Sequence, residues 1–221
     1  MMADRVDPGY EGASMSLAAK APEERRRRIL MAAVDVLRER GYSGTRVVDI
    51  AEAAGTSSGL VLYHFKSLEG VLAQALTTLE DDFYEGLARD LQATSGPVER
   101  LRYMGELGAG AGPAVGDWSL WLEIWVRALR DDGARLTREA LDSRWRSALR
   151  EVIDEGVASG EFAPRDAEAT TTRLASLMDG LAIQLALADP GMTPARMRDL
   201  WLESASLELG AEIRPADIGS R

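Results

Sequence analysis

The sequence predicts an all-α protein, and three observations favour that class. Apolar residues recur every three or four positions over long stretches, which is the period of an amphipathic helix, and no segment alternates as a half-buried strand does. Clusters of Gly, Pro, Ser and Asp separate these stretches. The chain has 221 residues, 46% hydrophobic and 28% charged, which is the composition of a globular protein that can bury a sizeable core.

The first three predicted helices are the most clearly delimited. Pro22 suits the first turn of a helix that carries the apolar stripe Ile29, Ala33, Val34 and Leu37 and ends at Gly41 in a left-handed cap. Thr45 is the expected N-cap of a short helix over 46–53. Gly55 ends that helix, and Thr56-Ser57 caps a third helix over 58–65.

The remaining elements are also predicted as helices. A long fourth helix runs from Ser67 to about Thr94, and Gly- or Pro-containing breaks then separate helices over 97–108, 114–131, 134–158, 165–188 and 194–208. This gives about nine helices. We expect residues 1–20 to form a disordered N-terminal tail and residues 210–221 a flexible C-terminal tail.

Composition and charge restrict the function. The chain has no cysteine and no apolar run of about 18 residues, and its N-terminus lacks the apolar segment of a signal peptide, so we expect a cytoplasmic protein without membrane contact, metal or cofactor. The formal net charge is −10, yet residues 20–66 hold nine Lys/Arg and six Asp/Glu, a local charge of +3. A polyanionic partner is therefore expected to meet this segment, although arginine runs also occur as solvated helix faces.

The two short helices have the layout of a helix-turn-helix. Ala51 allows close packing, Gly55 accepts the turn, and Val61 fills the shared core. The outer face then presents hydroxyls, backbone amides and a phenol, groups that bond phosphates and base edges in DNA. A purely structural helix pair is the alternative at this point.

The segment from Arg27 to Leu72 resembles the N-terminal domain of the tetracycline-repressor (TetR) family. The matching elements, in the family's order and spacing, are Gly41-Tyr42, Thr45, Ile50-Ala51, Ala54-Gly55, Gly59 and Tyr63-His64-Phe65. The resemblance implies a helix-turn-helix DNA-binding domain over 21–66 and an all-helical effector-binding and dimerisation domain over 67–209. It also implies a homodimeric repressor that a small molecule releases from its operator.

Carried over by position, the resemblance gives the expected DNA contacts. Arg46 approaches the phosphates, Thr45 caps its helix and touches phosphate, and the start of the third helix faces the groove. The family often has lysine where Ser58 and Leu68 stand and an aromatic residue where Leu62 stands; Lys66 is expected to replace one lost contact. The complete expected set is Thr45, Arg46, Thr56, Ser57, Ser58, Gly59, Tyr63, His64 and Lys66.

His64, the single histidine, has three interpretations. As a metal ligand it lacks a second His or any Cys, and as a general base it lacks an arranged nucleophile. Packing or DNA contact needs neither. We therefore expect a protein that is not an enzyme.

An effector site is expected in the acidic remainder. Trp118, Trp121 and Trp125 share one helix face, which is either a core stripe or the wall of a cavity for a flat or cationic ligand. Further candidates are Met104, Glu123, Met178, Asp179 and Gln184. The pattern through Trp121, Trp145, Gly160-Glu161-Phe162 and Asp179-Gly180-Leu181 resembles an effector-domain branch that includes repressors of betaine synthesis; that resemblance does not identify the ligand.

Dimerisation is expected through two C-terminal helices, Thr170 to Ala188 and Pro194 to Leu209, by the stripes that contain Leu174 and Leu181 on the first and Met197, Trp201 and Leu207 on the second. The same stripes could instead close the monomer's own core. The sequence thus predicts a ligand-responsive repressor that binds a palindromic DNA operator as a dimer. A helical ligand-binding or scaffold protein without DNA function is the alternative.

Overall fold

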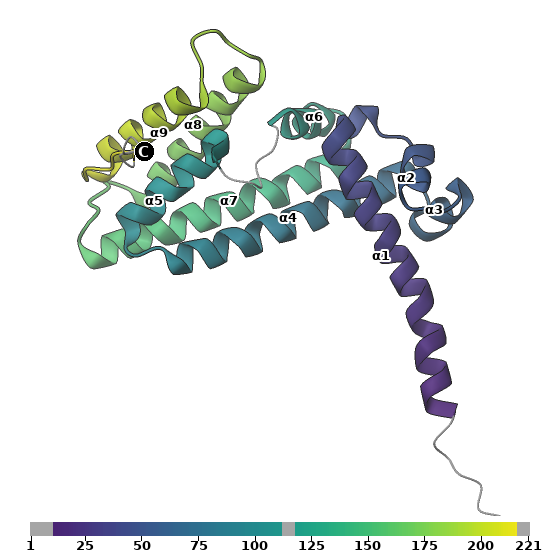
Figure 1. The fold of residues 1–221 in the computed structure, drawn as a ribbon. Helices are drawn as coiled ribbons and strands as arrows, with labels where there is room; N and C mark the ends of the chain where they lie inside the picture. Colours follow the sequence, from purple (N-terminus) through teal and green to yellow (C-terminus); the bar gives the residue numbers. More distant parts are fainter. Residues whose placement is uncertain (1–10, 112–117, 216–221) are drawn as a thin grey trace, which may run out of the picture. The chain divides into compact units, whose positions relative to one another are not determined.

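The computed structural model describes residues 11–111 and 118–215. Within these ranges the chain is all-α, with nine α-helices, one short π-helical segment and no strand, as predicted. Figure 1 shows their course. The helices are α1 (Glu11–Gly44), α2 (Val47–Ala53), α3 (Ser58–Phe65), α4 (Leu68–Ala93), α5 (Pro97–Glu106), α6 (Trp118–Ala128), α7 (Asp132–Ser159), α8 (Ala167–Ala186) and α9 (Pro194–Leu209), with the π-helical η1 (Leu107–Ala111) after α5.

The chain divides into two compact units, one ending at Leu79 and the other beginning at Glu80. In the first unit, α2 packs against both α1 and α3. Its core contains the predicted stripe of α1, with Ile29, Ala33 and Val34 fully buried, and also Ile50 and Val61. Burial of apolar area at about 25 cal/mol per Å² is what holds helices this short in place.

Two boundaries in this unit differ from the prediction. The first helix begins at Glu11 rather than near Pro22, so the expected tail is helical from residue 11 onward; residues 1–10 lie outside the described residues. Ala, Leu and Lys before Pro22 are good helix formers, which favours this extension. Gly41 interrupts α1 at the predicted position, with φ 70° and ψ 176°, which is a positive φ but not the expected left-handed cap.

The second unit is built around one apolar core. In it α7 packs on α5 and α8, and α8 packs on α9, with α5 contacting α9 as well (Figure 1). Trp201 is fully buried, and its indole N–H donates to the Leu174 carbonyl at 2.9 Å, so its one polar atom is satisfied. Near the end of α7, the Phe162 ring packs directly against the backbone of Gly156. A Cβ added at Gly156 would lie 2.0 Å from that ring, so only glycine fits there.

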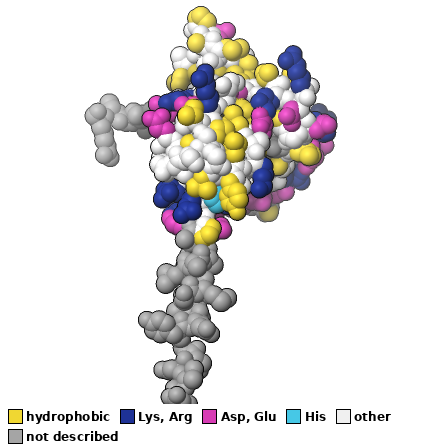
Figure 2. Space-filling view, turned by 90° about the vertical axis from the view of Figure 1, so that its right-hand side faces the viewer, with side chains coloured by type: hydrophobic (Ala, Val, Ile, Leu, Met, Phe, Trp, Pro, Cys, Tyr) yellow, Lys and Arg dark blue, Asp and Glu magenta, His cyan; other side chains and the backbone are white. Residues whose placement is uncertain are grey.

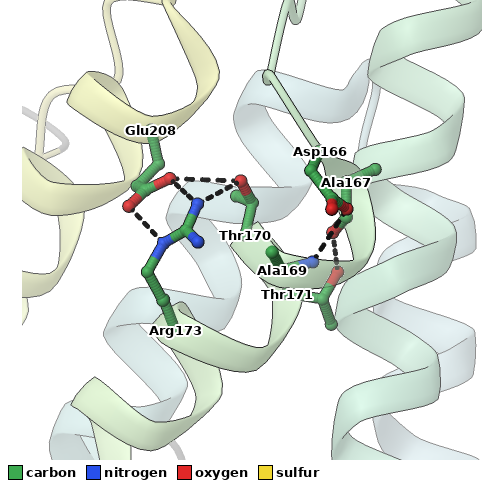
Figure 3. A network of polar contacts seen from close by, with 7 residues as sticks. All are labelled: Asp166, Ala167, Ala169, Thr170, Thr171, Arg173 and Glu208. Carbon is green, nitrogen blue, oxygen red and sulfur yellow. Dashed lines mark hydrogen bonds and ion pairs between the residues drawn. The ribbon is translucent and has the colours of Figure 1, made fainter.

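A polar network joins α8 to α9 (Figure 3). The Arg173 guanidinium donates to both carboxylate oxygens of Glu208, at 2.6 and 2.5 Å, and the buried Thr170 hydroxyl donates to Glu208 at 3.1 Å. Asp166 caps α8 by accepting from the Ala169 N–H at 3.0 Å. The bidentate pair fixes the register of the two helices because its geometry tolerates little sliding.

The predicted flexible C-terminal tail is wrong for its first residues. Ile213 is buried, and its N–H donates to the Ser206 hydroxyl at 3.0 Å, so the chain after Gly210 folds back on α9. Residues 216–221 of that prediction lie outside the described residues, as do residues 114–117 of the helix predicted before Trp118. None of the helices in the described part of the chain is both long and apolar enough to cross a membrane.

Candidate DNA interface and effector region

The turn between α2 and α3 has the predicted geometry. Gly55 adopts φ 60°, and the Thr56 N–H donates back to the Ala51 carbonyl at 2.9 Å. Ser57 caps α3 by accepting from the Leu60 N–H at 3.3 Å. Val61 is fully buried and Phe65 nearly so, which anchors α3 along one side and leaves the start of the helix free on the other.

The outer side of α3 carries the expected polar groups. Ser57 and Gly59 are exposed, Thr56 and Ser58 are half-buried, and Tyr63 is 70% exposed. Figure 2 looks onto the side where α2 and α3 lie and shows hydrophobic, basic and acidic side chains at the surface, with the cyan of the histidine among them. The Tyr63 phenol, in the last turn of α3, and the N–H groups of the first turn can each bind phosphate.

The end of α3 is held by Lys66. This residue has φ 71°, and its ammonium donates to the Tyr63 carbonyl at 3.1 Å while lying 5.5 Å from the centre of the Tyr63 ring. The His64 ring packs edge-on against Tyr63 at 5.3 Å between ring centres. The His64 ring also lies 6.4 Å from the Phe65 ring, between ring centres, so it belongs to an aromatic cluster at this helix end. Among the described residues no group of three His, Cys, Asp or Glu side chains could hold a metal ion.

The prediction that Thr45 caps the second helix is wrong. Arg46 is the N-cap of α2, and its N–H donates to the Asp49 carboxylate at 3.2 Å. Thr45 is 3% exposed and its hydroxyl donates to the Gly41 carbonyl at 2.7 Å, because the non-helical Gly41 leaves that carbonyl unpaired in the helix. The hydroxyl is therefore already used inside the protein, which leaves the exposed Arg46 side chain as the cation at the start of α2.

Seven of the eight residues predicted for an effector site divide into three groups. Met104 and Met178 are core residues, and Trp118 packs on that core with its indole N–H donating to the Gly108 carbonyl at 3.1 Å. Trp121, Trp125 and Glu123 are half-buried on α6, and the indole N–H of Trp125 is buried without a hydrogen-bond partner. Gln184 is exposed and is not brought to the others.

Asp179 belongs to a set of acids that the sequence analysis did not assemble. Burial, and after it the nearby Asp142, raise the pKa of its carboxyl to about 6, against the opposite effect of Arg138 and Arg146. Asp142 also acts on Glu80, which is only 6% exposed and whose pKa burial raises to about 8. Asp142 of α7 thus acts on both Asp179 of α8 and Glu80 of α4, and it is itself ion-paired with Arg138 at 2.7 Å.

Most of the predicted dimer stripes lie inside the monomer. Leu174, Leu181, Met197 and Trp201 are all buried in the core of the second unit, so these residues close the monomer's own core. Leu207, which the prediction also included, is not among the core residues. The opposite faces of the same two helices are open. Their exposed apolar residues are Leu187, 71% exposed, at the end of α8 and Leu207, 80% exposed, on α9.

Comparisons with known proteins match both units. The model of the tetR family of bacterial regulatory proteins matches residues 29–75, and the model of the C-terminal domain of BetI-type transcriptional repressors matches residues 97–209. The structure is similar to that of a transcriptional regulator from Saccharomonospora viridis in complex with choline, with TM-score 0.76 and 30% sequence identity, over 85% of this chain and 98% of that one.

Curated relatives agree with these matches. The HTH-type transcriptional repressor KstR2 of Mycolicibacterium smegmatis is 28% identical over 150 residues, which are 65% of this chain and 70% of KstR2. The HTH-type transcriptional regulator BetI of Paraburkholderia phymatum is 26% identical over 186 residues, 80% of this chain and 89% of that protein.

Proposed function

This chain belongs to the tetR family of bacterial regulatory proteins and is a ligand-responsive transcriptional repressor rather than an enzyme, and from that premise we propose that it binds a palindromic operator as a homodimer. The alternative, a ligand-binding or scaffold protein without DNA function, is not favoured, because the match over residues 29–75 covers the helices that such a protein would not need. A repressor of chromosomal genes acts in the cytoplasm.

The single observation that carries the DNA-binding proposal is the two-sided character of α3. Val61 fixes the helix from inside, while the start of the helix offers N–H groups and the hydroxyls of Ser57 and Ser58. We assign this start to the major groove, since short hydroxyl side chains reach either phosphates or base edges. Tyr63, Lys66 and Arg46 supply phosphate contacts on both sides of it.

Dimerisation is assigned to the outer faces of α8 and α9 that carry Leu187 and Leu207. Two such helices from each subunit form a four-helix interface with two-fold symmetry. That symmetry requires the operator to have two half-sites whose centres lie about 34–36 Å, or a multiple of that distance, apart.

Release is assigned to an effector bound in the second unit. The regulator of Saccharomonospora viridis was solved with choline, and choline is therefore the first effector to test on this chain. An effector weakens DNA binding only if it binds better to the conformation that does not fit the operator. We expect that conformation to differ in the tilt of α4, the helix through which the chain passes from one unit to the other.

The test is selection of genomic fragments by the purified dimer, followed by footprinting and by fluorescence anisotropy with and without choline. A protected palindrome with the half-site spacing given above is the expected result, and an effector that works should lower the affinity by a factor of about 5–150. A stable dimer that binds no selected fragment at low salt would support the scaffold alternative instead.

A further inference from the structure

The helix α3 carries few side chains that can read a base by hydrogen bonding. Its sequence is SGLVLYHF, which has none of the residues that pair with base edges through charged or bidentate hydrogen bonds, namely Arg, Lys, Asn, Gln, Asp and Glu. The hydroxyl of Ser57, just before the helix, is engaged as its cap and accepts from the Leu60 N–H at 3.3 Å. Other kinds of contact must therefore carry most of the sequence information that this helix reads.

One apolar side chain of α3 stands on the outer side of the helix. Leu62 is 39% exposed, whereas its neighbour Val61 is fully buried and Phe65 is 4% exposed. Leu62 follows Ser58 by four residues and Gly59 by three, so these three positions share one side of the helix. The side of α3 that we assign to the major groove thus presents a branched hydrocarbon group.

The described part of the chain gives no reason for glycine at position 59. Gly59 is not one of the glycines with positive φ, and a Cβ added there would meet only the Ser57 Oγ, at 3.9 Å, which is ordinary contact. In Gly70, by contrast, an added Cβ would lie 2.3 Å from the Phe65 carbonyl oxygen. Glycine is the poorest helix former after proline, so its place in α3 is explained by a partner that approaches the helix backbone closely.

Thymine is the base that an apolar side chain recognises in the major groove, because its edge carries the C5 methyl group. Contact between this methyl group and a leucine removes apolar surface of both from water, which is favourable. A cytosine in the same place would instead bring its N4 amino group to the leucine, and that donor would lose its hydrogen bond to water without gaining another. A leucine in the groove therefore favours thymine and disfavours cytosine.

We propose that Leu62 determines specificity by contacting the C5 methyl group of a thymine in each operator half-site, and that Gly59 lets α3 come close enough for this contact. The proposal rests on the proposed function, because it concerns the same interface with DNA. Arg46 at the start of α2 and the Tyr63 phenol, both exposed, position the domain on the phosphates, but contacts to phosphate carry no sequence information. Leu62 supplies that information.

The experiment replaces thymine by deoxyuridine, which lacks only the C5 methyl group, at each thymine of the selected operator in turn, in both half-sites together. Fluorescence anisotropy with the purified full-length protein measures the affinity for each operator. Loss of one buried methyl contact is expected to weaken binding about 4-fold, and loss of the contact in both half-sites about 15-fold. We expect at least one thymine position to show this loss with the wild-type protein.

Leu62→Ala should remove the sensitivity to that methyl group, so that this variant binds the thymine and the deoxyuridine operators with equal affinity. A residue that only supports the fold would lower the affinity for both operators alike, and the two effects would then be additive. Leu129→Ala changes a leucine of α6 that is 82% exposed, and this control should keep the full preference of the wild type. The scan of the wild-type protein does not depend on the folding of any variant.

Gly59→Ala tests the close approach of the helix. It should not lower the Tm, because the added Cβ has room within the protein, yet it should weaken operator binding about 10-fold or more, because the methyl group fills space that the DNA needs. Gly86→Ala on α4 also has room and should change neither quantity. Equal binding of both operators by the wild type, a preference that Leu62→Ala retains, or unchanged operator affinity of Gly59→Ala would each overturn the proposal.

Failure of this proposal is distinguishable from failure of the proposed function. A protein that protects a palindromic operator but binds the deoxyuridine form equally well contradicts only the role of Leu62. Selected half-sites that share no thymine would contradict the same role and leave the regulator intact. A protein that selects no DNA fragment contradicts both.

Discussion

The stability of this protein should depend on pH through Glu80, and Glu80→Gln should remove that dependence. In the folded state, burial holds the pKa of this carboxyl near 8 instead of 4.5. A carboxyl with a raised pKa contributes its full stability below its unfolded value and loses that contribution as pH rises through the folded value. The window for Glu80 therefore runs from about pH 4.5 to about pH 8.

The size of the effect follows from proton linkage. Each pH unit between the two pKa values is worth about 1.4 kcal/mol, so the wild type at pH 7 should have lost about 3 kcal/mol of unfolding free energy relative to pH 4.5 through this group alone. Glutamine at position 80 also leaves a buried amide without a partner, but that cost does not change with pH. The difference between the two proteins, rather than either value alone, carries the prediction.

Urea unfolding of both proteins between pH 4.5 and pH 8.5, at one fixed dimer concentration, measures this difference. The Glu80→Gln variant should gain about 3 kcal/mol on the wild type between pH 4.5 and pH 7, with a rise in Tm of about 2–4 °C for each kcal/mol in a chain of this size. Glu85→Gln serves as the control, since Glu85 is exposed. Stability curves that stay parallel over the whole window would refute the unpaired burial of Glu80.

Three other changes test separate parts of the molecule. Arg46→Ala should weaken binding to all DNA sequences about equally and reduce the salt dependence of binding by about one phosphate contact, as measured by fluorescence anisotropy at several salt concentrations. Arg135→Ala on α7 should change neither the affinity nor its salt dependence. Gly156→Ala should destabilise the protein by about 1–3 kcal/mol, by thermal unfolding, because its Cβ would lie 2.0 Å from the Phe162 ring; Gly86→Ala on α4 has room and should not destabilise it. Leu207→Glu should convert the dimer to a monomer in sedimentation experiments, since it places an unpaired charge in the proposed interface. Val157→Glu is the control: Val157 is also an exposed apolar residue, but it lies outside that interface, so the dimer should stay intact.

Local signals were sufficient to predict the helices and the DNA-binding turn. Ser57 and Gly55 act at the predicted positions because capping and positive φ depend on the nearest few residues. The error at Thr45 has a local cause as well: both Thr45 and Arg46 stand before the helix, and the choice between them depends on the carbonyl that Gly41 leaves free. A cap motif does not show which nearby carbonyl the backbone leaves unpaired.

What the apolar faces of α8 and α9 pack against could not be predicted from local signals. Periodicity shows that a helix has an apolar stripe, but it does not show whether the stripe meets the same chain or a second copy. Trp201 and Met197 could pack either in the monomer's own core or in a dimer interface, and they pack in the core. Leu207, which was among the residues predicted for the interface, stays exposed, whereas Leu187 of the proposed interface belongs to no stripe that the sequence marks.

Glu80 could have been found from the pattern of α4 itself. It stands four residues after Leu76 and seven before Leu87, both buried, so it occupies a position of the apolar stripe. A charge at such a position costs the fold several kcal/mol unless something pairs with it. Arg144 is held by Asp81 and Tyr84, so the carboxyl of Glu80 avoids that cost by carrying a proton, as its pKa of about 8 indicates. Burial is the first cause of that raised pKa; Arg144 lowers it, and the charges of Asp81 and Asp142 raise it further.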